Sequence, residues 1–306
     1  MWQTILTRLV SSLVTLFVIV TIAFFLIRAP KGSPFRYEKD VSSAVRQNIM
    51  KKYGLDKPLH IQYLIYLKTL LRGDFGYSTA YSNVTVNEII AKSLPVSMTV
   101  GLAALLFALF AGLATAIVST GFRSSLVDNL AMAVSMIGIT LPSFVIGTLL
   151  LLIFSFYLKL LPVAGWGGWG QLILPAVTLG LAPAAYIARI SRTSLMELRN
   201  RDFIRTARAK GLSEKTVLFK HMLKISLLPV ISFLGPAAAG ILTGTVVIEK
   251  IFSLPGLGRH FVNSALNRDY PLVMGTVIIY AVFLIAFNML VDISYRYIDP
   301  RIREQT

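Results

Sequence analysis

Six long apolar runs constrain this 306-residue chain more than any other feature. A transmembrane helix needs about 20 consecutive, largely apolar residues. The runs that qualify are Leu9–Ile27, Val96–Ser119, Leu130–Leu158, Leu172–Ala188, Ile225–Ile248 and Leu272–Val291. Hydrophobic residues make up 55% of the chain and charged residues only 14%, which is unusual for a soluble domain. The sequence therefore predicts an all-α, polytopic membrane protein with six transmembrane helices.

Prolines inside the third and fourth runs bear on whether these runs are spans. Pro142 lies inside the third run, and Pro175 and Pro183 lie inside the fourth. Membrane helices tolerate proline where neighbouring groups satisfy the freed carbonyls, so both runs are retained as spans. The first run is longer than the apolar core of a signal peptide, and no A-x-A cleavage site follows it. We therefore expect residues 1–29 to form an uncleaved anchor.

Positive charge gathers between the fourth and fifth runs. Residues 189–224 hold ten Lys and Arg against three acidic residues. Cytoplasmic loops are enriched in Lys and Arg, so this loop is predicted to be cytoplasmic, as are the N-terminus and the tail 295–306. Arg28, Lys31 and Arg36 oppose this orientation, but they begin a long outer segment, where the charge rule is weak.

The outer segment, residues 30–95, carries two predicted helices. Val41, Val45 and Ile49 fall four residues apart and indicate a short amphipathic helix. A second helix is expected from Pro58 to Arg72, with Gly73 as its stop. Its apolar side chains face either the membrane surface or a small core; they are Leu59, Tyr63, Tyr66, Leu67 and Leu70. The segment is either a helical cap over the spans or a docking surface for an outer partner.

Several kinds of chemistry find no support in the sequence. There is no cysteine, and His60, His221 and His260 lack metal-ligand spacing. The GWGGWG sequence at 165–170 lies in an outer loop without the strand and helix of a dinucleotide site, so it is interpreted as an interfacial turn. No P-loop occurs, and the spans carry almost no ionisable residues at their centres. We expect no catalytic residue, metal or cofactor in this chain.

The spans do carry uncharged polar side chains. Such residues either pack helices together or line a polar translocation path. Because small residues cluster in the fifth run, the candidates for path lining are Ser232, Thr243, Thr245 and, in the sixth run, Asn288.

The basic loop contains a predicted break between two helices. Phe203–Lys210 is expected to be helical, and Gly211 can adopt the positive φ that ends a helix. Ser213 suits an N-cap, with Glu214 in the next first turn. A helix-turn-helix that reads DNA has similar spacing. The segment is held by a span at each end and has no core of its own, so we expect no nucleic-acid partner.

The segment FIRTARAKGLSEKTVLFKHMLKISLLPVI resembles the cytoplasmic loop of bacterial ABC-importer permeases, whose pattern is E-A-A, then Gly, then I-x-L-P. Thr206-Ala207-Arg208 stands where that family has E-A-A, a version similar to the oligopeptide and dipeptide branch. Further segments resembling this branch, and most of all its B-type oligopeptide permeases, are APKGSPF, KYGLDKPL, GDFGYS, VIEKIFSLPGLGRHFVNSALNRDYPLV and DPRIR.

The resemblance implies a type I ABC-importer permease fold over residues 96–294 and a location in the bacterial inner membrane. The implied partners are a second, related permease, two cytoplasmic ATPases that bind ATP and Mg, and a periplasmic or lipoprotein binding protein that delivers oligopeptides. The implied ATPase-coupling residues are Arg205, Thr206, Ala207, Arg208, Lys210, Gly211, Leu212, Ser213 and Glu214. Dipeptides, nickel or another small solute are alternative substrates, and a proton-coupled secondary transporter is the alternative class.

Overall fold

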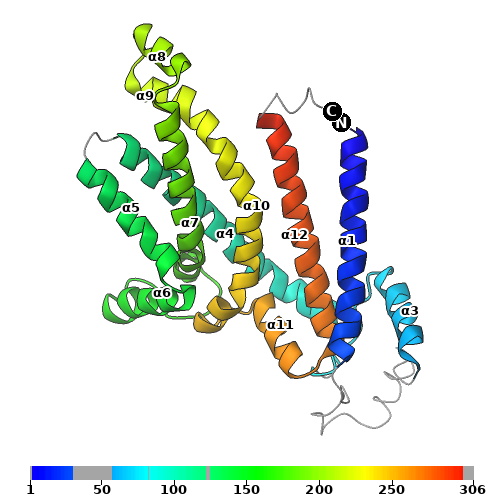
Figure 1. The fold of residues 1–306 in the computed structure, drawn as a ribbon. Helices are drawn as coiled ribbons and strands as arrows, with labels where there is room; N and C mark the ends of the chain where they lie inside the picture. The colour runs from blue at the N-terminus through cyan, green and yellow to red at the C-terminus, as the bar shows by residue number, and fades with distance from the viewer. Residues whose placement is uncertain (1, 30–56, 82, 122–124, 299–306) are drawn as a thin grey trace. The chain divides into compact units, whose positions relative to one another are not determined.

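The computed structural model describes residues 2–29, 57–81, 83–121 and 125–298 (Figure 1). The expected helix around Val41, Val45 and Ile49 lies outside these residues. The described residues form helices, with one isolated backbone bridge between Tyr77 and Thr85. The helices are α1 (Trp2–Arg28), α3 (Leu59–Leu70), α4 (Val86–Gly121), α5 (Ser125–Thr140), α6 (Ser143–Leu150), the π-helix η1 (Leu151–Tyr157), α7 (Trp169–Leu198), α8 (Asp202–Ala209), α9 (Glu214–Thr216), the π-helix η2 (Val217–Met222), α10 (Leu223–Ile251), α11 (Leu257–Leu266) and α12 (Tyr270–Ile298). The predicted all-α fold is confirmed.

Five of the six predicted spans are single helices long and apolar enough to cross a membrane. They are Leu6–Arg28, Val86–Gly121, Trp169–Leu198, Glu214–Ala238 and Tyr270–Val291. The α4 helix begins ten residues before the predicted apolar run because Thr85 caps it. Its side chain accepts a hydrogen bond from the Glu88 backbone N–H at 3.2 Å.

The third predicted span is bent rather than straight. Its parts, Asp128–Thr140 and Ser143–Tyr157, meet at an angle of 109°. Proline has no N–H to donate and restricts the residue before it, so the helix stops ahead of Pro142 and restarts after it. The pair is either a broken span or a re-entrant segment.

The basic loop is also shorter than the sequence predicted. Residues 189–198 continue α7, and residues from Glu214 onward run through α9 and η2 into α10. The part between the two long helices is therefore α8 and its short flanks. The α7 helix outlasts its apolar run because its last turns still bury Ser191, Leu195 and Leu198.

The described chain divides into two compact units, the first formed by Met1–Ser97 and Pro255–Ile285. In this unit, Val20 and Phe24 of α1 are buried against Met274 and Ile278 of α12. Four of the five apolar side chains predicted on α3, namely Tyr63, Tyr66, Leu67 and Leu70, pack on this cluster, whereas Leu59 is 49% exposed. Of the two alternatives for this helix, a small core is the one observed.

The second unit is formed by Met98–Leu254 and Ala286–Thr306, and α7 is its central helix. This helix packs on α5, α6 and α10. The approach of α5 and α7 is close: a Cβ placed on Gly138 would lie 2.6 Å from the Leu181 carbonyl oxygen. Small residues that allow backbones to meet in this way are typical of membrane helix pairs.

Candidate functional site

The predicted coupling segment forms an elbow, residues 202–216, made of α8, a three-residue turn after Lys210, and α9. Gly211 has φ +80°, and two backbone bonds close the end of α8: the Gly211 N–H donates to the Arg208 carbonyl at 2.9 Å and the Leu212 N–H donates to the Ala207 carbonyl at 3.3 Å. This is the pattern of a Schellman motif, in which glycine at the left-handed position ends a helix. No heavy atom of the described residues lies within 4 Å of a Cβ built on Gly211, so its φ, and not crowding, favours glycine here.

Ser213 starts the second arm of the elbow, as predicted. It has extended backbone angles, and its hydroxyl accepts a hydrogen bond from the Thr216 backbone N–H at 3.3 Å. The two hydroxyls of Ser213 and Thr216 are also 2.9 Å apart. The side chain thus satisfies one of the N–H groups left free at a helix start.

A small apolar core attaches the elbow to the second unit. Ile204 of α8 and Val217, the first residue of η2 directly after the elbow, are both completely buried. They lie in one cluster with Ala116 of α4, Leu195 and Leu198 of α7, Ala207, and Met222. Because α8 and η2, on either side of the turn and α9, share this core, packing as well as the turn fixes the angle between them.

Arg208 holds the two arms together by polar contacts. Its Nε and Nη2 atoms donate to the two carboxylate oxygens of Glu214 at 2.7 and 3.2 Å. Its Nη1 atom donates to the Arg199 backbone carbonyl, just past α7, at 3.3 Å. A bidentate arginine–carboxylate pair fixes orientation as well as distance. Arg208 therefore joins α7, α8 and the start of α9.

The structure gives Thr206-Ala207-Arg208 a local role. Ala207 is buried in the small core, and the Thr206 hydroxyl bonds the Asp202 carbonyl of its own helix at 2.9 Å. The large apolar side chains exposed on the elbow are Phe203 and Leu212, which are 43% and 39% exposed. All nine predicted coupling residues lie in this one segment; the exposed ones are Arg205, Thr206, Lys210, Gly211, Leu212, Ser213 and Glu214.

The predicted path-lining residues do not form an equally clear group. The Ser232 hydroxyl bonds the Leu228 carbonyl of its own helix at 3.1 Å. Asn288 is exposed, and its Oδ1 atom lies 2.9 Å from a Cβ built on Gly235. The side chains of Thr243 and Thr245 lie outside the described ones. Both interpretations, helix packing and path lining, stay predictions.

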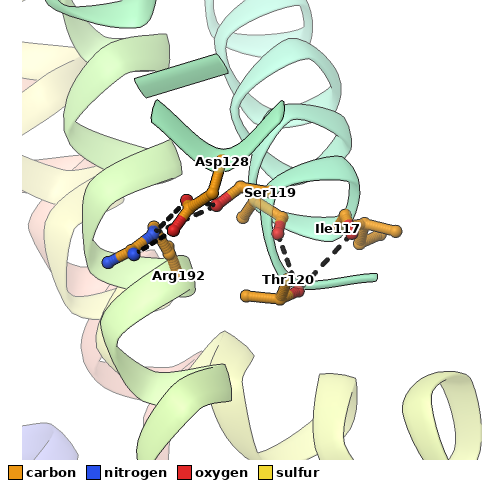
Figure 2. A network of polar contacts seen from close by, with 6 residues as sticks. Ile117, Ser119, Thr120, Asp128 and Arg192 are labelled. Carbon is orange, nitrogen blue, oxygen red and sulfur yellow. Dashed lines mark hydrogen bonds and ion pairs between the residues drawn. The ribbon is translucent and has the colours of Figure 1, made fainter. Parts of the chain in front are cut away.

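A polar network at the ends of three helices was missed by the sequence reasoning (Figure 2). Arg192 of α7 donates from Nε to Asp128 Oδ1 of α5 at 2.7 Å and to the Ser119 hydroxyl of α4 at 3.1 Å. Its Nη2 atom pairs with the second Asp128 oxygen, and Ser119 also donates to Asp128. The sequence did hold a signal for this pair: Asp128 precedes the third predicted span and Arg192 follows the fourth, so opposite charges lie at the same end of neighbouring spans.

A second network, in the first unit, was also missed. Asp269 is completely buried directly before α12. Its carboxylate accepts hydrogen bonds from the Ser78 hydroxyl and from the backbone N–H groups of Thr79 at 3.1 Å and Ala80 at 3.3 Å. It also caps its own helix by accepting from the Leu272 N–H at 3.2 Å. One carboxylate thus fixes a turn from residues almost 200 positions earlier.

Two family models together match residues 1–304 of the chain. Residues 1–103 match the N-terminal region of binding-protein-dependent transport system membrane components, and residues 104–304 match the binding-protein-dependent transport system inner membrane component. The chain is 46% identical over 305 residues to the oligopeptide transport system permease protein OppB of Haemophilus influenzae, covering 99% of this chain and 100% of that protein. It is 45% identical to the dipeptide transport system permease protein DppB of Lactococcus lactis, covering 98% of each.

Solved structures of ABC transporters share its fold. An amino acid ABC transporter chain superposes with a TM-score of 0.55 at 16% identity, covering 69% of this chain and 94% of that one. A chain of the inward-facing MetNI methionine ABC transporter gives a TM-score of 0.53 at 18% identity, with 70% and 94% covered. Together with the apolar helices and the full-length relatives, these matches show a multi-pass membrane protein that belongs to the binding-protein-dependent transport system inner membrane components.

Proposed function

We propose that this chain is an OppB-like permease subunit of an ABC importer and that it translocates oligopeptides across the bacterial inner membrane. The observation that carries the proposal is the elbow: a rigid, charged pair of short helices between two long apolar ones. Full-length identity of 45–46% to oligopeptide and dipeptide permeases supports the substrate class.

The elbow is the part of the proposed machine that transmits energy. Its exposed Phe203 and Leu212 give a partner apolar contacts, and Arg205 and Lys210 give charged ones. Because α8 and η2, which follows the elbow, share a buried core with α4 and α7, a force on the elbow reaches the long helices without first bending the turn. ATP and Mg would bind in the partner ATPases, and this chain would hydrolyse nothing.

The remaining partners follow from the same proposal. A second, related permease completes the path, two ATPase subunits bind on the cytoplasmic side, and an outer binding protein delivers the peptide. Both termini and the elbow then lie in the cytoplasm, in agreement with the ten basic residues of 189–224. A dipeptide substrate is the second candidate, because the Lactococcus lactis relative is almost as similar.

Substitution of Gly211 tests the coupling role. Proline fixes φ near −65° and has no N–H, so Gly211→Pro removes both the +80° turn and the bond to the Arg208 carbonyl. We expect this variant to insert into the membrane at normal abundance while its ATPase subunits no longer co-purify and peptide uptake is lost.

The matched control is Gly211→Asn. Asparagine tolerates the left-handed conformation, and the space around the glycine is open. This variant should keep both ATPase binding and most of the uptake. Normal ATPase binding and uptake in Gly211→Pro would refute the coupling role.

A further inference from the structure

A groove between α5 and α7 is not used by the proposed transport function. It has a volume of about 400 Å³ and is open on one side. Its wall includes Asp128, Met132 and Met136 from α5, and Arg189 and Arg192 from α7. Both helices belong to the second unit, and Figure 1 shows them side by side.

The charged residues of the groove are not equivalent. Arg192 is engaged by Asp128 and Ser119, as Figure 2 shows. Arg189, one helical turn earlier on the same face, is exposed and has no ion pair among the described residues. Two arginines and one aspartate leave the groove with one net positive charge. An anion is therefore the complementary ligand, with Arg189 as its contact.

Arg189 lies at the depth of lipid headgroups. Trp169, which is 85% exposed at the first residue of α7, suits one membrane interface. Arg189 follows it by about twenty residues, a rise of about 30 Å along a helix, which equals the thickness of the hydrocarbon core. The arginine thus reaches the opposite interface, on the side of the elbow.

The apolar part of the groove leads from that interface toward the membrane centre. Met132, Met136 and Ile139 follow Asp128 on α5 with the spacing of a single helix face. Met136 is 51% exposed. An apolar track that ends at an exposed cation with no ion pair in the described part of the chain matches a phospholipid, with its acyl chain on the methionines and its phosphate at Arg189. A free phosphate would leave this track uncovered.

We propose that the α5–α7 groove binds one anionic phospholipid in the same leaflet as the elbow. Arg189 contacts the headgroup phosphate, and the Asp128–Arg192 pair holds the two helices at the spacing that the lipid needs. Basic pockets between membrane helices on the cytoplasmic side are known to bind anionic headgroups.

The test is native mass spectrometry of the whole assembled transporter, titrated in parallel with phosphatidylglycerol, phosphatidylcholine and glycerol 3-phosphate. Wild type should retain phosphatidylglycerol in preference to phosphatidylcholine. Arg189→Gln should weaken phosphatidylglycerol binding about fivefold, whereas Arg189→Lys should retain most of it. Met136→Gln should weaken lipid binding without changing the response to glycerol 3-phosphate.

Arg201→Gln is the matched control, because it removes the same charge from the same side of the membrane outside the groove. An equal loss in this variant would overturn the proposal, since it would indicate general surface attraction. Binding of glycerol 3-phosphate with the same dependence on Arg189 would identify a free phosphate instead. The chain has no cysteine, so Met132→Cys can be cross-linked selectively; a cross-link to the second permease would show a protein in the groove and refute lipid binding.

Discussion

Arg208 is the residue on which the elbow depends most. Its three hydrogen bonds reach Glu214 and the Arg199 carbonyl, so its guanidinium is turned inward, toward the chain itself. An exposed ion pair of this kind contributes only about 0.5 kcal/mol to stability. The main effect of the Arg208–Glu214 pair is geometric, because it fixes the angle at which the two arms meet a partner.

Charge reversal at this pair separates bracing from direct contact. Arg208→Glu places two carboxylates across the turn and should abolish most peptide uptake. Combined with Glu214→Arg, it restores an ion pair between the arms, and uptake should recover to at least half of wild type. A double variant as inactive as the single one would mean that Arg208 itself contacts the ATPase.

Asp269 has a comparable role in the first unit. Replacing it by alanine leaves the Ser78 hydroxyl and the Thr79 and Ala80 N–H groups without their acceptor in a buried site. Asp269→Ala should lower the free energy of unfolding by roughly 3 kcal/mol. Asp202→Ala is the control, because that side chain is 98% exposed and should change stability little. The comparison is made by thermal unfolding of the purified transporter, and equal melting temperatures would contradict this role.

His260 adds a pH dependence to the same unit. Burial, together with the charge of neighbouring Arg259, lowers the pKa of His260, and its Nδ1 atom is buried with no hydrogen-bond partner among the described residues. The folded state then binds fewer protons than the unfolded state. The contribution of His260 to the free energy of unfolding is therefore fully present above the pKa of a histidine in the unfolded chain, about 6.5, and is lost as the pH falls below that value. The melting temperature of wild type should fall more between pH 8 and 5.5 than that of His260→Gln; parallel curves would refute this.

At the scale of the helices, prolines have different outcomes in two of the predicted spans. Pro175 and Pro183 lie inside the fourth run, yet its helix is continuous and is the central one of the second unit. Pro142, in contrast, divides the third run. The difference lies in the neighbours: α7 is enclosed by α5, α6 and α10, whose packing retains the helix around its prolines. The sequence alone does not show which helices will meet.

The contact of α5 with α7 should respond sharply to one added side chain. Valine at Gly138 would place its Cβ 2.6 Å from the Leu181 carbonyl, so the helices must separate. Gly138→Val should destabilise the transporter by about 2 kcal/mol or more, measured as a fall in melting temperature. Gly240→Ala, where a Cβ meets open space, should leave it unchanged or slightly raise it. Equal effects of the two variants would contradict the close contact.

For the whole molecule, residue type predicts where helices end and begin, whereas the polar side-chain pairs depend on contacts between different elements of the fold. The stop at Gly211 and the start at Ser213 follow from residue type, and both are confirmed. The Arg208–Glu214 brace, the Asp128–Arg192 pair and the Asp269 network depend on side chains brought together by the fold. The two partners of such a pair have no fixed spacing in the sequence, so sequence patterns do not predict these pairs.

The central claim, that this chain moves peptides with energy from partner ATPases, is tested most directly by its energy source. The complete transporter is reconstituted in proteoliposomes with its binding protein, and uptake of a labelled oligopeptide is measured with ATP, without ATP, and with a proton ionophore. We predict uptake that requires ATP and is unchanged by the ionophore. Uptake that persists without ATP and collapses with the proton gradient would contradict the account.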